Sequence, residues 1–446
     1  MKTSQNSRDK KTVSPWLLPI LAFAVAVGGW GVWNNPSLQE RWVSAMTLEQ
    51  VAQARGERRD DVRLLYYHGL RLNEARDFAQ AEPLLAQAAE LSPDRAEVRR
   101  EWARAQTALG NTNAAFQQLR QFVGTHPNNA EAHLLLGNFY LSVKAGKKAL
   151  VELEEAVNLD PKAHEAWKSL AATRYEFSLD ATKTEEAIQK ALALSPDDPA
   201  TNLLHARFLT KENRPEARAA FLRVLELAPE DADARQAFAD YLLLKGQSEE
   251  DLHRAGAEAR TALQINPELD YARFVLGSVL LQEKNASEAV RWLREAAVAL
   301  PRNPAVAREL AAAYRQLHQG EQAEQWQQEF VARQEYQGKR QQLMAAALTG
   351  TDNKPAYDKL STFLATHGEV EEAIRYRALA LGVVPDDPAV LSKVAEELIL
   401  GGYPMTALPL AQRAAAAAPE DTQVQDALRH AQSAITGQSP ATPEQP

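Results

Sequence analysis

A proline recurs at nearly constant spacing through most of this 446-residue chain. The first seven lie 34, 34, 35, 33, 38 and 34 residues apart, and an 84-residue gap precedes a last pair that is again 34 apart: Pro93, Pro127, Pro161, Pro196, Pro229, Pro267, Pro301, Pro385 and Pro419. A period near 34 over several hundred residues predicts an array of repeats rather than one compact core.

Small residues occupy two further positions in each repeat. Twelve residues before each proline stand Ala81, Ala115, Ala149, Thr184, Ala217, Ala255, Ala289, Ala373 and Ala407. Twenty-four residues before five of the prolines stand Gly69, Ala103, Gly137, Gly277 and Ala395. Two helices cross closely where neither carries a bulky side chain, so these positions predict the contact between two helices of one hairpin.

Apolar residues between these positions follow helical spacing. In residues 133–161 the face of the first helix is marked by Leu136, Gly137 and Tyr140, and that of the second by Ala149, Leu153 and Ala156. Pro161 ends the unit because proline cannot continue a helix. Each repeat is therefore predicted to be a helical hairpin.

The pattern resembles that of the tetratricopeptide repeat family over residues 62–419, in which ten imperfect units can be counted. The resemblance implies an all-α fold, a right-handed α-solenoid of about ten hairpins. We divide it into eight repeats at 62–335, an irregular joint at 336–353 and two repeats at 354–419. A capping helix at 420–436 and a disordered tail at 437–446 follow. The helix through Trp326 and Phe330 is expected to run toward Leu348, and about four extra residues near 244–254 to lengthen one hairpin turn.

Residues 16–33 contain no charged side chain. At about 1.5 Å per residue a helix of this length crosses the hydrocarbon core of a bilayer. Trp16 lies at one end, and Trp30 and Trp33 at the other, as indoles do at membrane interfaces. Residues 1–15 carry four basic side chains against one acidic. These features predict a transmembrane anchor at 16–33, a cytoplasmic N-terminus at 1–15 and a juxtamembrane helix or spacer at 34–61.

Two alternatives to this topology remain open. A cleaved signal peptide could end at the small residues of 22–24 or 24–26. A reversed topology would place the repeats in the cytosol. The favoured prediction is a single-pass protein of the bacterial inner membrane with its repeats in the periplasm.

Composition excludes several kinds of chemistry. The chain has no cysteine, so disulfides, thiolate nucleophiles and cysteine zinc sites are impossible. Its 59 acidic against 50 basic residues argue against nucleic-acid binding. No histidine pair has metal-binding spacing, and the repeats leave no span for a catalytic domain. We therefore expect no catalytic residue, no metal, no cofactor and no enzymatic activity.

The resemblance implies that partners bind in a concave groove lined by the first helix of each hairpin. Counting from the repeat starts gives nine candidate groove residues: Arg100, Arg104, Asn138, Lys168, Tyr175, Asn202, Asp240, Tyr271 and Phe274. The clamp that grips carboxyl termini in chaperone-binding members is not matched, because Tyr66 and Leu70 occupy the first of its positions. A peptide or helix of another protein is the expected ligand.

The sequence thus predicts a membrane-anchored scaffold that recruits envelope proteins, with lipid contact through residues 16–33. One alternative is a structural component of an exopolysaccharide or secretion assembly. Another, if the topology is reversed, is a cytosol-facing receptor.

Overall fold

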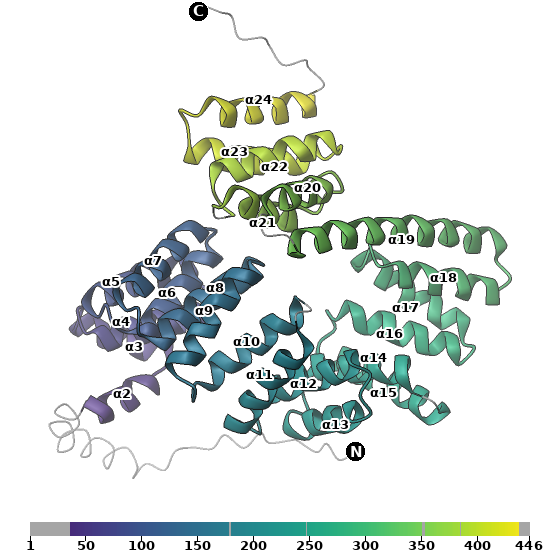
Figure 1. Cartoon of the computed structure of the whole chain (residues 1–446), viewed down its shortest axis with the longest axis horizontal. Helices are drawn as coiled ribbons and strands as arrows, with labels where there is room; N and C mark the ends of the chain where they lie inside the picture. The colour runs from purple at the N-terminus through teal and green to yellow at the C-terminus, as the bar shows by residue number, and fades with distance from the viewer. Residues whose placement is uncertain (1–35, 178–179, 247, 350–352, 384, 437–446) are drawn as a thin grey trace, which may run out of the picture. The chain divides into compact units, whose positions relative to one another are not determined.

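A computed structural model describes residues 36–177, 180–246, 248–349, 353–383 and 385–436. These ranges contain helices α2 to α24 and no strand (Figure 1). The segments predicted at 1–15, 16–33 and 437–446 lie outside the described residues. Among the helices within those ranges, none combines the length and the apolar character needed to cross a membrane.

Helices α4 to α23 alternate in chain order as the first and second helices of ten repeats. The first helices are α4 (Val62–Glu74), α6 (Ala96–Ala108), α8 (Ala130–Ser142), α10 (His164–Glu176), α12 (Pro199–Lys211), α14 (Ala232–Lys245), α16 (Asp270–Gln282), α18 (Pro304–Gln316), α20 (Lys354–Ala365) and α22 (Pro388–Leu400). The second helices are α5 (Phe78–Leu91), α7 (Thr112–Thr125), α9 (Gly146–Leu159), α11 (Ala181–Leu194), α13 (Ala217–Leu227), α15 (Glu249–Ile265), α17 (Ala286–Ala299), α19 (Gly320–Thr349), α21 (Val370–Leu381) and α23 (Pro404–Ala417). A helix α24 (Thr422–Thr436) follows the last hairpin. The helical-repeat fold predicted from the sequence is confirmed.

The chain divides into two compact units, residues 1–118 and 119–446. The sequence gives no sign of this division, because the regular repeat continues across it. The predicted blocks at 62–335 and 354–419 remain a prediction.

The small residues lie at the helix crossings, as their spacing predicts. Gly137 on α8 faces Leu153 on α9, and an ideal Cβ built on the glycine would lie 2.7 Å from Leu153 Cγ. The same relationship joins Gly69 to Leu85 and Gly277 to Leu293. Since real Cβ atoms do not approach that closely, these crossings require glycine.

The turn inside a hairpin contains a residue in the left-handed backbone region. Lys144, Asn213 and Lys284 have φ values of 59°, 55° and 62° there. Glycine takes this conformation at no steric cost, whereas in other residues the Cβ atom makes it strained. The sequence suggests Gly146 for the turn before α9. In the structure Lys144 takes the left-handed conformation, and Gly146 begins α9 against the ring of Phe177.

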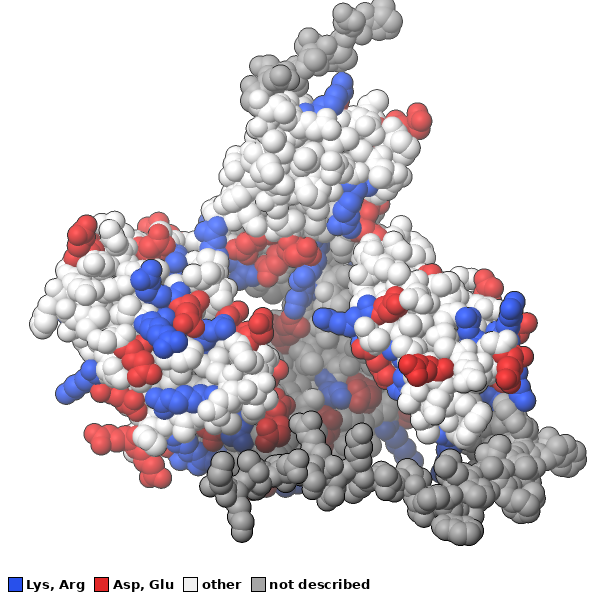
Figure 2. All heavy atoms as spheres, turned by 180° about the vertical axis from the view of Figure 1, so that it is seen from behind, with Lys and Arg blue, Asp and Glu red and all other residues white. Residues whose placement is uncertain are grey.

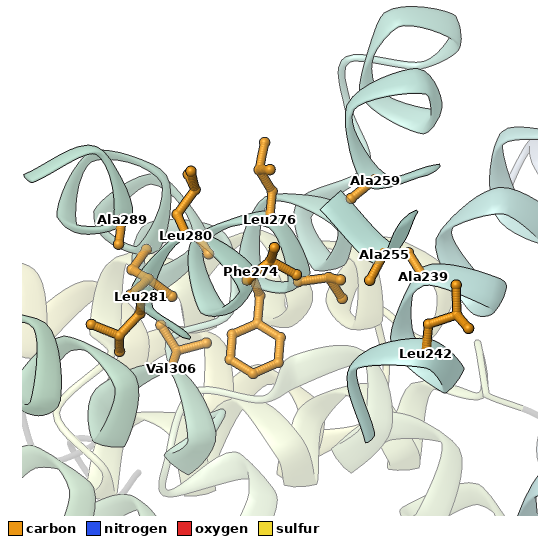
Figure 3. Packing of buried hydrophobic residues seen from close by; sticks show 14 of the residues in the cluster. Ala239, Leu242, Ala255, Ala259, Phe274, Leu276, Leu280, Leu281, Ala289 and Val306 are labelled. Atoms are coloured by element: carbon orange, nitrogen blue, oxygen red, sulfur yellow. The ribbon is translucent and has the colours of Figure 1, made fainter. Parts of the chain in front are cut away.

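Apolar side chains of successive hairpins form continuous cores. The largest runs from α12 to α19, and Figure 3 shows part of it, with Ala239, Ala255 and Leu276 from three successive helices. A second core joins α19 to α24 around Leu364, Val394 and Leu410. Within these two cores each hairpin buries its apolar face against the next, as the units of a repeat array do.

One departure from the regular repeat differs from expectation. The extra residues near 244–254 do not lengthen the turn; they extend α15, which has 17 residues where most second helices have 14. The helix through Trp326 and Phe330 runs on past Leu348, as expected, because α19 has 30 residues and ends at Thr349. Gly338 stands within that helix with open space around its α-carbon.

Two short helices, α2 (Pro36–Ser44) and α3 (Leu48–Glu57), precede the first hairpin and pack on α4. Val43, Met46 and Val51 form a small core with Leu64. The Arg71 guanidinium donates to the carbonyl oxygens of Ser44, at 2.7 Å, and Met46, at 3.2 Å. Residues 36–57 are therefore a packed extension of the repeats.

Candidate functional site

A hollow of about 270 Å³ lies on the face formed by first helices α10, α12, α14 and α16. These helices are neighbours in space, since α10 contacts α12, α12 contacts α14 and α14 contacts α16. The side chains around it are Tyr175, Arg207, Thr210, Lys211, Phe221, Gln236, Ala237, Asp240, Tyr241 and Tyr271. Phe221 belongs to α13, and the others belong to the four first helices. The hollow lies wholly within the unit of residues 119–446.

Two cationic side chains reach the hollow from α12. The Lys211 ammonium lies over the Tyr175 ring, 5.1 Å from its centroid, in a cation–π contact. Arg207 is half-buried, and within the described chain its guanidinium forms no hydrogen bond or ion pair. It acts at longer range on Tyr175 and Asp240, favouring the ionised form of each. The hollow therefore contains a positive charge that no close anion neutralises.

Asp240 is the acidic side chain of the hollow. The Tyr271 hydroxyl donates a hydrogen bond to Asp240 Oδ1 across 3.1 Å. Burial raises the pKa of Asp240 above its ordinary value, even though that hydrogen bond and Arg207 both act to lower it. Burial likewise raises the pKa values of Tyr175 and Tyr271. All three groups thus lie in poorly hydrated surroundings.

Aromatic rings supply the apolar part of the surface. The ring centroids of Phe221 and Tyr241 lie 5.4 Å apart, and Phe238 stacks on both. Phe221 is 2% exposed and anchored in the core, whereas Tyr241 is half-buried and reaches the hollow. The site combines two cations, one hydrogen-bonded carboxylate and a set of packed aromatic rings.

Three of the nine candidate residues line this hollow: Tyr175, Asp240 and Tyr271. Lys168 is paired elsewhere, with Glu165 at 2.7 Å and Asp198 at 3.8 Å. Phe274 is 6% exposed and belongs to the hydrophobic core. Asn202 is buried and hydrogen-bonded to backbone carbonyls at the start of its own helix.

The remaining candidates lie on other helices. Asn138 is exposed on α8. Arg100 and Arg104 are exposed on α6, in the unit of residues 1–118, and Arg104 pairs with Glu101 at 3.5 Å. The basic patch expected from Arg100, Arg104 and Lys168 therefore remains a prediction. Figure 2 shows basic and acidic side chains interspersed on the face it presents.

Sequence reasoning missed Arg207, Lys211 and Tyr241. A signal for Arg207 exists, because it has the same position after Pro196 as Asp240 has after Pro229. The sequence contains no comparable signal for Tyr241. This residue directly follows Asp240, and helical geometry alone would point its side chain toward a neighbouring hairpin. Phe221 reaches the hollow from a second helix, which counting along first helices cannot reveal.

Comparison with known proteins identifies the repeat. Residues 108–173, from the end of α6 to α10, match the family model described as tetratricopeptide repeat. This segment of the chain is similar to a tetratricopeptide repeat. The match includes the hairpin α8–α9, whose Gly137–Leu153 crossing recurs in other hairpins of the chain. A search of curated protein sequences finds no match.

Several solved structures are similar to parts of the chain, and two of those described next are of tetratricopeptide proteins. A thermophilic example from Thermus thermophilus is 24% identical, with a TM-score of 0.36, and covers 41% of this chain and 99% of its own. PilF of Pseudomonas aeruginosa is 20% identical, with a TM-score of 0.40, and covers 49% and 97%. A tetratricopeptide protein from Parabacteroides merdae is 16% identical, with a TM-score of 0.43, and covers 56% and 98%. At these scores the structures carry no argument about function.

Proposed function

We propose that this protein is a scaffold that holds other proteins on the face formed by its first helices, with the hollow around Arg207 as a principal contact point. The observation that carries the proposal is the half-buried guanidinium of Arg207 beside Tyr175, Tyr241 and Tyr271. Burying an arginine without a close anion is unfavourable unless a ligand supplies one. Tyrosine and arginine are also the residues that contribute most at protein–protein contacts.

The proposal includes attachment to a bacterial inner membrane through residues 16–33, with the repeats in the periplasm. The charge-free segment and the basic residues before it support this topology. Helix α2 begins three residues after Trp33, and Tyr67 donates from its hydroxyl to Glu40 on α2 across 3.0 Å. If residues 16–33 span the bilayer, the packed helices α2 and α3 would connect the anchor to the first hairpin.

The absence of cysteine permits a direct test of topology. Single cysteines would be introduced as Ser4→Cys, in the N-terminal segment, and Val151→Cys, on α9, where the side chain is 64% exposed. A membrane-impermeant maleimide would then be added to cells with a permeabilised outer membrane. The proposal predicts labelling at position 151 at once and at position 4 only after lysis, with full-length protein in the membrane fraction.

The opposite labelling pattern would contradict the periplasmic placement. Recovery of a shortened chain from the soluble fraction would contradict the anchor and favour cleavage. Neither result would affect the assignment of the hollow, which rests on the described helices alone.

A further inference from the structure

The hollow carries a positive charge, whereas the chain as a whole is acidic. The protein has a formal net charge of −9, yet the Lys, Arg, Asp and Glu side chains around the hollow are two cations and one carboxylate. That carboxylate, Asp240, already accepts the Tyr271 hydroxyl at Oδ1. An incoming anion therefore finds a local positive charge in a largely acidic protein.

Arg207 is suited to receive a carboxylate. Its guanidinium presents a planar set of donors that match the two oxygens of a carboxylate, and in the described chain none of them is used. Partial burial excludes some of the water that would weaken such a bond. Lys211, one helical turn further along α12, adds a second positive charge over the Tyr175 ring.

The size of the hollow limits what can enter it. About 270 Å³ is below the usual range for small-molecule sites, about 300–1,000 Å³, and suits one or two side chains of a peptide segment. Tyr241 and Ala237 offer apolar surface beside the charged end. A segment with an acidic and an apolar side chain next to each other would use both parts.

We infer that the hollow binds an aspartate or glutamate side chain of a partner protein between Arg207 and Lys211, with an adjacent apolar side chain of the same segment against Tyr241. This inference rests on the proposed scaffold function and names the partner chemistry of that site. The negative charge of Asp240 repels the bound carboxylate. This repulsion limits the affinity and makes binding depend on an accurate fit.

The test is selection of random dodecapeptides on the purified full-length chain in detergent. Enriched peptides should share one acidic residue next to an apolar one. In the best peptide, replacing the acidic residue by its amide, glutamate by glutamine or aspartate by asparagine, should weaken binding about tenfold. This is the size expected for loss of a charge-assisted hydrogen bond. Amidation of the peptide's carboxyl terminus should leave the affinity unchanged.

Variants of the protein should respond in opposite directions. Arg207→Gln and Lys211→Gln should weaken the best peptide, by about tenfold for Arg207, and Asp240→Asn should strengthen it about threefold. Arg260→Gln on α15 and Lys190→Gln on α11 are matched controls, because both side chains are exposed outside the hollow. Circular dichroism and thermal unfolding would verify that each variant is folded.

The outcomes separate the inference from the proposed function. No enrichment on the folded wild-type chain would contradict the scaffold function itself. Enriched peptides without an acidic residue would overturn only the inference, as would affinity that depends on a free carboxyl terminus or on a phosphorylated residue. The same holds if Arg207→Gln binds as well as Arg260→Gln.

Discussion

The side-chain amide of Asn202 donates a hydrogen bond to the carbonyl oxygen of Pro196 across 2.9 Å. The same contact occurs in six successive repeats, each time between the repeat proline and the side chain six residues later. The pairs are Arg99 with Pro93, His133 with Pro127, Trp167 with Pro161, Asn202 with Pro196, Arg235 with Pro229 and Arg273 with Pro267. Four chemically different side chains thus close one kind of turn between hairpins.

This relationship gives Asn202 a structural role. Asn202→Ala should lower the free energy of unfolding by about 1–2 kcal/mol, because the buried side chain loses its hydrogen bonds to the carbonyl oxygens of Pro196 and Asp198. Peptide affinity should not change. Urea denaturation would measure the loss, with the exposed Asn158→Ala on α9 as the control. Loss of peptide binding with unchanged stability would instead show that Asn202 belongs to the binding surface.

The helix crossing at Gly137 should not accept a larger residue. Gly137→Leu is expected to cost about 1–3 kcal/mol, because Leu153 already fills the space. Gly338, within α19, has no atom near its missing Cβ, so Gly338→Ala should stabilise the chain by about 1 kcal/mol through helix propensity. Thermal unfolding of both variants tests the contrast, and equal effects of the two substitutions would refute it.

These two glycines show what the sequence could and could not reveal. The 34-residue period and the small residues predicted the hairpins and the Gly137 crossing, because a close helix contact constrains residue size directly. Gly338 lies inside α19 and does not end it, because one glycine within a helix costs only about 1 kcal/mol. Arg207 and Tyr241 became visible as a site only when side-chain packing from five helices was known.

Asp240 should make stability depend on pH. Since burial raises its pKa in the folded state, folding favours the protonated carboxyl group. The resulting stability is greatest below the ordinary pKa of aspartate and is lost as the pH rises through the raised value. Asp240→Asn keeps an acceptor for Tyr271 and should be more stable than the wild type at pH 7. Unfolding curves from pH 4 to 8 would test this, with exposed Asp233→Asn as the control. Parallel pH profiles for Asp240→Asn and the wild type would contradict it.

A buried ion pair holds the last two hairpins. Arg377 is 2% exposed and pairs with Glu397, which is 5% exposed, and with Asp358. The Thr362 hydroxyl also accepts from Arg377 at 3.0 Å and donates to Glu397 at 2.8 Å. Arg377→Met should therefore destabilise the chain by about 3–5 kcal/mol, because it leaves the Glu397 carboxylate buried and unpaired.

The double substitution Arg377→Met with Glu397→Met should recover much of that loss, since an apolar pair can replace a buried ion pair at little cost. A double-mutant cycle by chemical denaturation would measure the coupling. Strictly additive losses would show that the two side chains do not stabilise the fold as a pair.

The most direct measurement of the central claim is site-specific photo-crosslinking in living cells. A photoreactive phenylalanine analogue would replace Gln236, which lines the hollow, and in a second strain Val298, which is 84% exposed on α17. The account predicts a discrete crosslinked partner at position 236 that is absent at position 298 and is lost when Arg207→Gln is added. The same products at both positions, or a product at 236 that persists with Arg207→Gln, would contradict the claim that partners are held in this hollow.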